Sequence, residues 1–228
     1  MTPHMTPDMS AHMPAQTPVP PYQIHHYPAA LIETRALAVG RRLTLRPILP
    51  QDAELLAALV RELAPLARHN RFHGAVNLAA ARLHQMSHVD YQRELAVVVT
   101  AQVNGAERLV ADARYCVAPD GCSAEFALVV AEGWQRLGVG AWAMSALQQA
   151  ATNAGLEWLE GAVLSGTLPM LGLMQRCGFA LCPHPEEDGV VKVQRRLGVQ
   201  EPALPHAKHG LLSWWQKAWP GSAFAMAT

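Results

Sequence analysis

The stretch A-E-F-A-L-V-V-A-E-G-W-Q-R-L-G-V-G-A, residues 124–141, constrains the fold more than any other part of the chain. Its first half is a nearly continuous run of apolar and β-branched residues, which is typical of a buried strand. After a short connection that contains Gly138 and Gly140, apolar residues recur at helical spacing from Val139 onward. The pattern predicts a strand that passes through a glycine-containing loop directly into an amphipathic helix.

A loop of this kind suits a phosphate or a pyrophosphate. Backbone N–H groups at a helix start point toward one place and carry partial positive charge, and glycine lets the main chain approach an anion closely. Arg136 adds a side chain that can form a charge-assisted hydrogen bond to a phosphate. The chain lacks both G-x-x-x-x-G-K-[ST] and a G-x-G-x-x-G followed by an acidic residue, so P-loop and dinucleotide-binding folds are not expected. By themselves, two glycines are equally compatible with a purely structural turn.

The remaining patterns predict an α+β fold, with a mixed, mostly antiparallel sheet of about six or seven strands flanked by helices. Strands are expected where β-branched or alternating residues lie between turn signals such as Asn104-Gly105. Helices are expected where apolar residues share one face, and Gly155 and Gly178 are suitable stops. The expected strands are 31–37, 41–46, 95–100, 109–117, 123–130, 158–164 and 189–197, and the expected helices are one from Pro50 and those over 76–86, 139–154 and 168–177.

The composition divides the chain into three regions. Residues 1–26 are rich in proline, methionine and histidine, and we expect them to form a disordered tail. Thioether and imidazole groups also suit soft metals, but a solvated tail is the simpler interpretation, and no metal is expected. Residues 27–200 have the composition of a single globular domain, and residues 201–228 form a C-terminal extension.

The composition also limits the partners. Eighteen basic residues balance 18 acidic ones, so nucleic acid held by counterion release is not expected. Four cysteines are too few for a disulfide scaffold, no signal sequence begins the chain, and no apolar run is long enough to span a bilayer; these features favour the cytoplasm. Trp214, Trp215 and Trp219 give the extension an apolar stripe, which we expect to dock on the domain or across a homodimer rather than on a membrane.

The loop also has a family resemblance. Gln135-Arg136-Leu137-Gly138-Val139-Gly140-Ala141 resembles the Q/R-x-x-G-x-G/A signature of the GNAT superfamily of N-acetyltransferases. The helix at Pro169-Met170 that ends in Gly178-Phe179 resembles the last motif of that family. The resemblance implies that these seven loop residues bind the pyrophosphate of acetyl-CoA.

One branch of the family is similar over a wider region, about residues 27–197. This branch is the bacterial protein-lysine acetyltransferases, whose domain is often fused to acyl-CoA synthetase-like domains. The similar segments are Tyr27-Pro28, L-T-L-R-P-I-L-P-Q-D-A (43–53), Arg71-Phe72, D-Y-Q-R-E-L-A (90–96), A-R-Y (113–115) and A-E-F-A-L-V-V (124–130).

Glu125 is the leading candidate for a general base. A free lysine amine has a pKa near 10.4 and must lose a proton before it can attack a thioester, and a positioned carboxylate accelerates such a step by roughly 10²–10⁴. Glu125 lies within an otherwise apolar strand, and the glutamate of A-E-F-A is the proposed base in the family it resembles. The structural alternative is a salt bridge at a sheet edge. Leu128, Val129 and Val130 are expected to offer backbone groups to the pantetheine arm and the thioester oxygen.

Other site residues are assigned more loosely. Tyr115 is a candidate acid for the leaving thiolate, although buried tyrosines more often only pack and form hydrogen bonds. Asp90 and Glu94 are candidates for holding the incoming amine, with surface ion pairs as the alternative. The resemblance places Thr167 and Met170 at the pantetheine; relatives usually have Asn at the position of Thr167, and Thr keeps a hydroxyl that can cap the helix.

These observations predict an enzyme that moves an acetyl group from acetyl-CoA to an amine. The resemblance favours the ε-amino group of a protein lysine as the acceptor. Two alternatives remain open from the sequence, namely a small-molecule amine acetyltransferase and an acyl-CoA-binding module without turnover. The sequence does not name the acceptor, the acyl chain or the oligomeric state.

Overall fold

The computed structural model describes residues 24, 26–37, 40–63, 80–185 and 187–198. Almost all of the predicted N-terminal tail, the Arg71-Phe72 pair and the predicted C-terminal extension lie outside these residues. The elements in chain order are η1 (Ala29–Leu31), β1 (Glu33–Ala36), β2 (Arg42–Pro47), η2 (Pro50–Asp52), α1 (Ala53–Glu62), α3 (Ala80–Ser87), β3 (Glu94–Val103), β4 (Ala106–Val117), β5 (Ser123–Val130), η3 (Glu132–Trp134), α4 (Val139–Asn153), β6 (Trp158–Leu164), α5 (Leu168–Arg176), β7 (Ala180–Pro183) and β8 (Val190–Arg196), where η marks a 3-10 turn.

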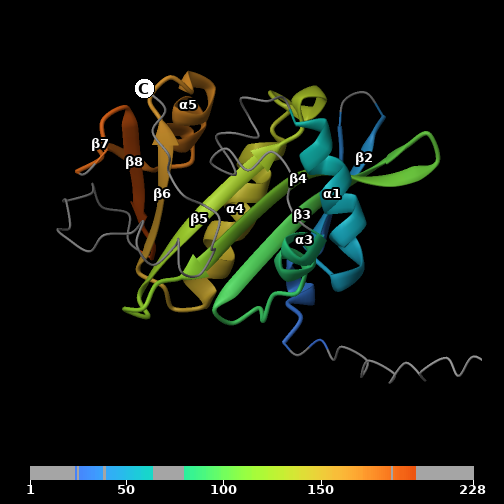
Figure 1. The fold of residues 1–228 in the computed structure, drawn as a ribbon, viewed down its shortest axis with the longest axis horizontal. Coiled ribbons are helices and arrows are strands. Elements are labelled where there is room, and N and C mark those ends of the chain that lie inside the picture. Colours follow the sequence, from blue (N-terminus) through green and yellow to red (C-terminus); the bar gives the residue numbers. More distant parts are fainter. Residues whose placement is uncertain (1–23, 25, 38–39, 64–79, 186, 199–228) are drawn as a thin grey trace, which may run out of the picture.

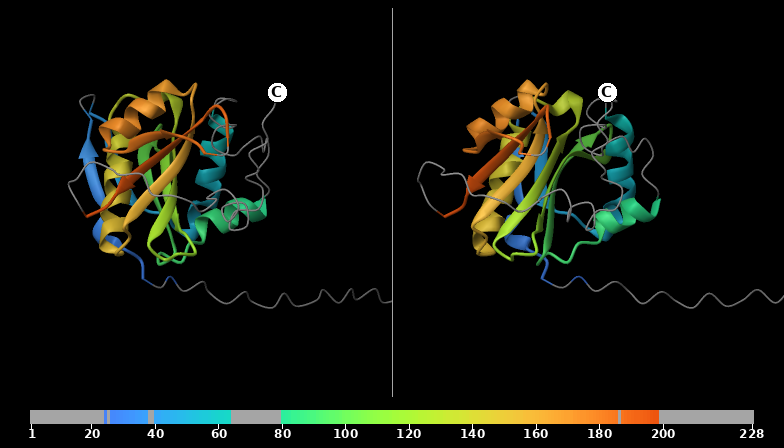
Figure 2. Two further views of the ribbon diagram at one scale, coloured as in Figure 1. Left: turned by 90° about the vertical axis from the view of Figure 1, so that its left-hand side faces the viewer. Right: turned by 60° about the vertical axis from the view of Figure 1, so that its left-hand side comes forward.

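The strands form one eight-stranded sheet in the order β1-β2-β3-β4-β5-β6-β8-β7 (Figure 1). Neighbouring strands are antiparallel except β5 and β6, which are parallel. Helices α4 and α5 cover one face of the sheet, and α1 and α3 cover the other (Figure 2). The predicted α+β class is confirmed. The strand count exceeds the expectation because β7, only four residues long, gave no separate signal beside the glycine stop of α5.

The central strand β3 shows why the sheet needs helices on both faces. Leu95 and Val97 lie in the core beneath α4, whereas Ala96 and Val98 lie in the second core beneath α1 and α3. All four are almost completely buried. Successive side chains of a strand point to opposite faces, so a continuous apolar run is stable only when both faces are covered.

The end of α5 follows the predicted glycine stop. Gly178 has a φ of 82°, in the left-handed region that glycine adopts without a steric penalty. The N–H of Phe179 donates to the carbonyl of Met174 at 3.0 Å, and the N–H of Gly178 donates to the carbonyl of Gln175 at 2.9 Å. These two bonds form a Schellman motif, and Phe179 and Met174 are both buried in the same core, as the sequence predicts.

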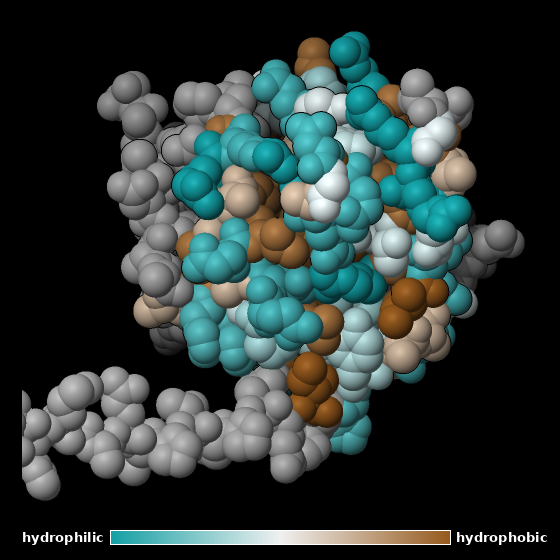
Figure 3. Space-filling model, turned by 90° about the vertical axis from the view of Figure 1, so that its right-hand side faces the viewer, coloured by the Kyte–Doolittle hydropathy of each residue, from teal (hydrophilic) through white to brown (hydrophobic). Residues whose placement is uncertain are grey.

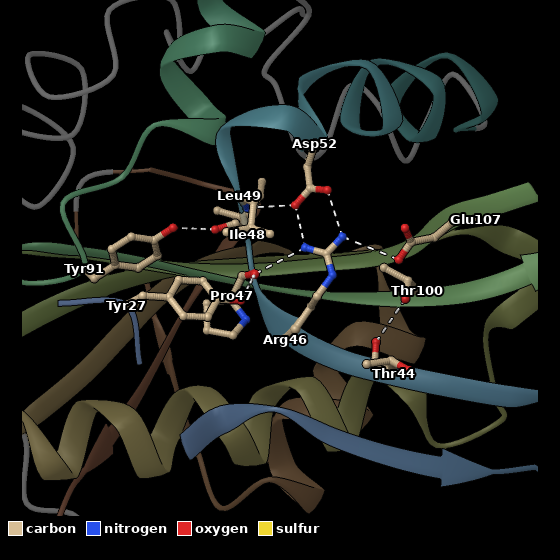
Figure 4. Close-up of polar contacts among 10 residues, drawn as sticks. All are labelled: Tyr27, Thr44, Arg46, Pro47, Ile48, Leu49, Asp52, Tyr91, Thr100 and Glu107. Carbon is tan, nitrogen blue, oxygen red and sulfur yellow. Dashed lines mark hydrogen bonds and ion pairs between the residues drawn. The ribbon is translucent and has the colours of Figure 1, made fainter. Parts of the chain in front are cut away.

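A buried ion pair determines how β2 turns into α1 (Figure 4). The guanidinium of Arg46 binds both carboxylate oxygens of Asp52, at 2.6 and 2.8 Å, and Asp52 also accepts the N–H of Leu49 at 2.7 Å. The Tyr27 hydroxyl donates to the Pro47 carbonyl at 3.2 Å, which ties the first residues of the domain to the same corner. This part of the family-like segment 43–53 therefore supports the fold rather than the chemistry.

The side of the molecule that carries β1 and β2 is mostly hydrophilic. Hydrophilic side chains cover most of the face in Figure 3, and apolar ones form only small separate patches among its described residues. All four residues of β1 are exposed, as suits the edge of a sheet. No helix in the described residues is both long and apolar enough to cross a membrane.

Candidate active site

Strands β5 and β6 stay side by side over only a short distance. Their pairing joins residues 123–125 to residues 158–160 and ends at Glu125. Beyond that point β5 continues along β4, and β6 continues along β8, so the two strands diverge toward α5 and the loop before α4 (Figure 1). Within the described chain, the backbone of residues 126–130 therefore has a strand partner on one side only. Its other side is suited to an extended ligand that binds as an added strand would.

The connection between β5 and α4 has the predicted strand–loop–helix form. Arg136 and Gly138 have φ angles of 60° and 83°, so the main chain turns through the left-handed region twice. Residues 135–138 are exposed. The first bond of the helical ladder runs from the N–H of Trp142 to the carbonyl of Gly138, so the N–H groups of Val139, Gly140 and Ala141 precede the ladder. Such amides form an anion site at a helix N-terminus.

The two glycines of the loop have different physical roles. Gly138 needs its φ of 83°, and a Cβ there would meet nothing within 4 Å. Gly140 lies in α4, where a Cβ would come within 3.0 Å of Leu173 Cδ2 and 3.4 Å of Val130 Cγ2. Gly138 therefore shapes the turn, whereas Gly140 lets α4 approach α5 and β5 closely.

The end of β5 is held by the loop that follows it. The side-chain amide of Gln135 donates to the Val130 carbonyl at 3.1 Å, so this carbonyl already has a partner in the protein. Leu128 and Val129 are buried on opposite faces of the sheet. Their side chains are therefore unavailable to a ligand between β5 and β6, and only their backbone N–H and carbonyl groups can bind it.

Helix α5 begins beside the place where the strands separate. Thr167 is its N-cap residue, but its side chain makes no capping hydrogen bond, contrary to the expectation from the sequence. Its carbonyl instead accepts the N–H groups of Met170 and Leu171, at 3.0 and 3.1 Å. Its φ of −91° and ψ of 62° depart from the extended backbone that usually lets an N-cap side chain reach the first turn. Met170 packs against the core beneath α4.

Glu125 lies at the last paired position before the strands diverge. Its side chain is buried, with 6% of the residue exposed, and its Oε2 has no hydrogen-bond partner within the described chain. Burial first, and then the charge of the neighbouring Glu160, raise the pKa of the Glu125 carboxyl to about 8. The structural alternative of a salt bridge is not what the geometry shows. A carboxyl in this state can accept a proton near neutral pH.

The match to a family follows the same segments. A model described as an acetyltransferase (GNAT) domain matches residues 42–180, which include the loop, Glu125 and α5. The chain belongs to the GNAT acetyltransferase family. It is an N-acetyltransferase that depends on acyl-CoA, as the family resemblance of the sequence implies.

Individual relatives agree with the assignment. The GNAT domain is 29% identical to an acetyltransferase of Pseudomonas aeruginosa over 65% of this chain and 80% of that protein. It is also 29% identical to the acetyltransferase Pat of Mycolicibacterium smegmatis, over 61% of this chain but only 41% of the longer Pat chain. The crystal structure of the GNAT domain of S. lividans PAT has the same fold, with a TM-score of 0.67 at 24% identity, over 75% of this chain and 99% of that one.

The structure separates Tyr115 from Glu125. Tyr115 pairs with Phe126 across β4 and β5, and Cys116 pairs with Glu125. Directly paired residues share a face, so Tyr115 lies on the α4 side of the GNAT sheet and Glu125 lies on the α1 side. Burial raises the pKa of the Tyr115 hydroxyl to about 12. This placement does not bring the predicted acid and the predicted base together, and we do not carry Tyr115 into the proposed mechanism.

The two acids assigned to the acceptor amine differ in position. Asp90 is exposed, and its Oδ1 accepts three backbone N–H groups, those of Gln92, Arg93 and Glu94, at 2.8 to 2.9 Å. This carboxylate oxygen therefore shapes the loop before β3. Glu94 pairs with Cys116, which pairs in turn with Glu125, so Glu94 lies in the same row of side chains as the candidate base.

Sequence reasoning missed two charged residues, one in this row and one beside it. Glu160 pairs with Glu125 across β5 and β6, and its Oε2 lies 3.1 Å from the Nζ of Lys192 on β8. Both side chains are mostly buried. The only signal for Glu160 was a lone acid in the apolar strand W-L-E-G, and nothing in the sequence shows that this acid pairs with Glu125. Among the described residues, no group of three or more His, Cys, Asp or Glu residues is arranged to hold a metal ion.

Proposed function

We propose that this enzyme transfers the acetyl group of acetyl-CoA to the ε-amino group of a protein lysine, with Glu125 as the general base. The observation that carries the proposal is the buried Glu125 carboxyl, whose Oε2 has no partner among the described residues, at the point where β5 and β6 separate. The relatives and the loop support acetyl transfer, and Glu125 supplies the chemistry that an amine acceptor requires.

The proposed reaction is a direct attack. The neutral amine nitrogen forms a bond to the thioester carbonyl carbon, the carbon–sulfur bond then breaks, and coenzyme A leaves as the thiol or thiolate. The amine must release a proton on the way, and the Glu125 carboxylate accepts it directly or through one water. Because burial raises the pKa of Glu125 to about 8, this carboxylate is a stronger base than an exposed one. No covalent intermediate with the enzyme is required.

The binding of acetyl-CoA is assigned to three parts of the domain. The N–H groups of residues 139–141 and the exposed Arg136 would hold the pyrophosphate. The backbone of 128–130 would accompany the pantetheine arm, and one N–H of this stretch would stabilise the developing oxyanion. Thr167 and Met170, at the start of α5, would contact the pantetheine arm.

A protein lysine is the proposed acceptor because the family-like segments resemble the branch of the family that modifies protein lysines. Glu94 supports a cationic acceptor, since it shares the row of Glu125 and is half-buried. Burial and the nearby Asp90 raise the pKa of Glu94, whereas Arg114 and Arg82 act against that shift. A lysine ammonium entering this row would find carboxylates ready to hold it and to take its proton.

Turnover assays test the proposal. Thiol release from acetyl-CoA is measured with casein as a lysine-bearing protein and with spermidine as a small amine, and acetylated products are identified by mass spectrometry. We expect transfer to protein lysines, and a loss of at least about 10²-fold in kcat for Glu125→Gln with unchanged binding of coenzyme A. Transfer to spermidine alone would replace the protein acceptor with a small one. Undiminished turnover by Glu125→Gln would remove this residue from the mechanism.

A further inference from the structure

The row of side chains that contains Glu125 continues onto β6 at Glu160, which forms an ion pair with a diagonal neighbour on β8. Glu160 is the direct cross-strand neighbour of Glu125, so both side chains stand on the same face. Lys192 lies diagonally from Glu160 across β6 and β8, and the Nζ–Oε2 distance of 3.1 Å makes an ion pair. The side chains of Glu160 and Lys192 are only 10% and 16% exposed, so water screens this pair weakly.

We propose that Glu160 is a positioning residue for Glu125: its charge, held in place by Lys192, sets the pH at which the base becomes ionised. This inference rests on the proposed function of Glu125. Two carboxylates on adjacent strands are about 5 Å apart at their backbones, which is close enough for one charge to disfavour the other. Lys192 holds the Glu160 carboxylate in an ion pair at 3.1 Å, which fixes a negative charge beside Glu125.

Among the residues that the structure describes, Glu160 is the charged group that acts on Glu125. On β4, Cys116 lies opposite Glu125, and further along the same face Asp112 and Arg114 neutralise each other at 2.7 Å. On β3, Glu94 lies beyond Cys116. Arg82 of α3 interacts electrostatically with Glu94 and with Arg114. On β8, the neighbour of Glu160 is the neutral Gln194. The pKa of Glu125 responds to burial and to Glu160.

The ion pair with Glu160 requires a positive charge at position 192. Lys192 is the one lysine between residues 24 and 198; every other cation in that region is an arginine, and Lys208 and Lys217 follow it. An arginine guanidinium also carries a positive charge, so the proposed role of position 192 requires a cation there but not an amine. Substitution by arginine is therefore a test of charge alone.

The test measures the ionisation of Glu125 directly. The glutamate side-chain carboxyl carbons are isotope-labelled and titrated by NMR, and the Glu125 signal is assigned by its loss in Glu125→Gln. Glu160→Gln should lower the pH midpoint of Glu125 by about one pH unit. The single variants Glu160→Asp and Lys192→Arg keep the charges. In each of them the pH midpoint of Glu125 should stay near the wild-type value. Glu157→Gln, which removes an exposed acid just before β6, is the matched control and should not move it.

Kinetics separates this inference from the proposed function. The low-pH limb of kcat/KM should move with the NMR midpoint in Glu160→Gln, while the KM for acetyl-CoA stays the same. A midpoint that does not move in Glu160→Gln would overturn the role of Glu160, whether or not Glu125 is the base. A midpoint that moves while the kinetic limb stays in place would confirm that the charge of Glu160 acts on the Glu125 carboxyl and would overturn Glu125 as the base.

Discussion

Replacing Glu125 with glutamine should lower kcat by at least about 10²-fold and, above neutral pH, make the protein more stable. The carboxyl has an ordinary pKa of 4.5 in the unfolded chain and a pKa of about 8 in the folded domain. The folded state therefore holds its proton more tightly, and folding is favoured at low pH. As the pH rises from 4.5 to 8, Glu125 ionises in the unfolded chain but stays protonated in the folded domain. The free energy of unfolding of the wild type therefore falls over this range. Glutamine has the same shape and no such cost.

The magnitude follows from the two pKa values. Each pH unit between them costs about 1.4 kcal/mol, so the full cost of an ionised Glu125 above pH 8 is about 5 kcal/mol. This figure is an upper limit, because local opening around an ionised carboxyl admits water. Below pH 4.5 both side chains are neutral, and the two proteins should have nearly equal free energies of unfolding. The advantage of the variant should then grow with pH and level off above pH 8.

Urea denaturation of both proteins at a series of pH values between 4 and 9 measures this difference. Glu157→Gln removes an equal charge from the exposed surface and should give only a small difference at every pH. A stability difference for Glu125→Gln that stays constant across the series would show that Glu125 titrates alike in both states. The reasoning for a buried base would then be refuted.

Three other changes test separate parts of the structure. Gly138→Ala should destabilise the fold by about 1 kcal/mol and weaken binding of coenzyme A by about tenfold, because a φ of 83° strains a residue that has a Cβ. Calorimetric titration measures the binding. An unchanged Kd would contradict the proposed role of the turn. Arg114→Met should lower the free energy of unfolding in urea by about 3–5 kcal/mol, because the buried Asp112 loses the guanidinium of its ion pair. A loss under about 1 kcal/mol would contradict a stabilising role for that pair. Lys192 should remain unmodified when the wild type is incubated with acetyl-CoA, because its ammonium forms an ion pair with Glu160, and it should become acetylated in Glu160→Gln. Peptide mass spectrometry measures the acetylation of Lys192. Acetyl-Lys192 in the wild type would show that the ion pair does not protect the amine.

Much of the fold follows from local patterns. The glycine at position 178 stops α5 because no other residue adopts its left-handed backbone so cheaply, and the alternation along β3 requires two covered faces. The loop at 135–141 is predictable for the same reason, since its geometry depends on neighbours in sequence. The buried pair of Arg46 and Asp52 shows the limit of such reasoning. From the sequence, Asp52 is expected only as an acid in the first turn of a helix. The structure alone shows that it forms an ion pair with Arg46.

The sequence by itself predicted the family, the course of the strands and helices, the conformation of the turn proposed to bind the pyrophosphate, and Glu125 as the residue proposed as the base, because each of these shows in short runs of residues. Only the tertiary structure decided what surrounds that base. A strand presents alternate residues to opposite faces, so the register of β4 against β5 places Tyr115 away from Glu125, and the register of β5 against β6 places Glu160 beside it. A slip of one residue in either pairing would reverse these relations, and nothing local to either strand sets the register between them.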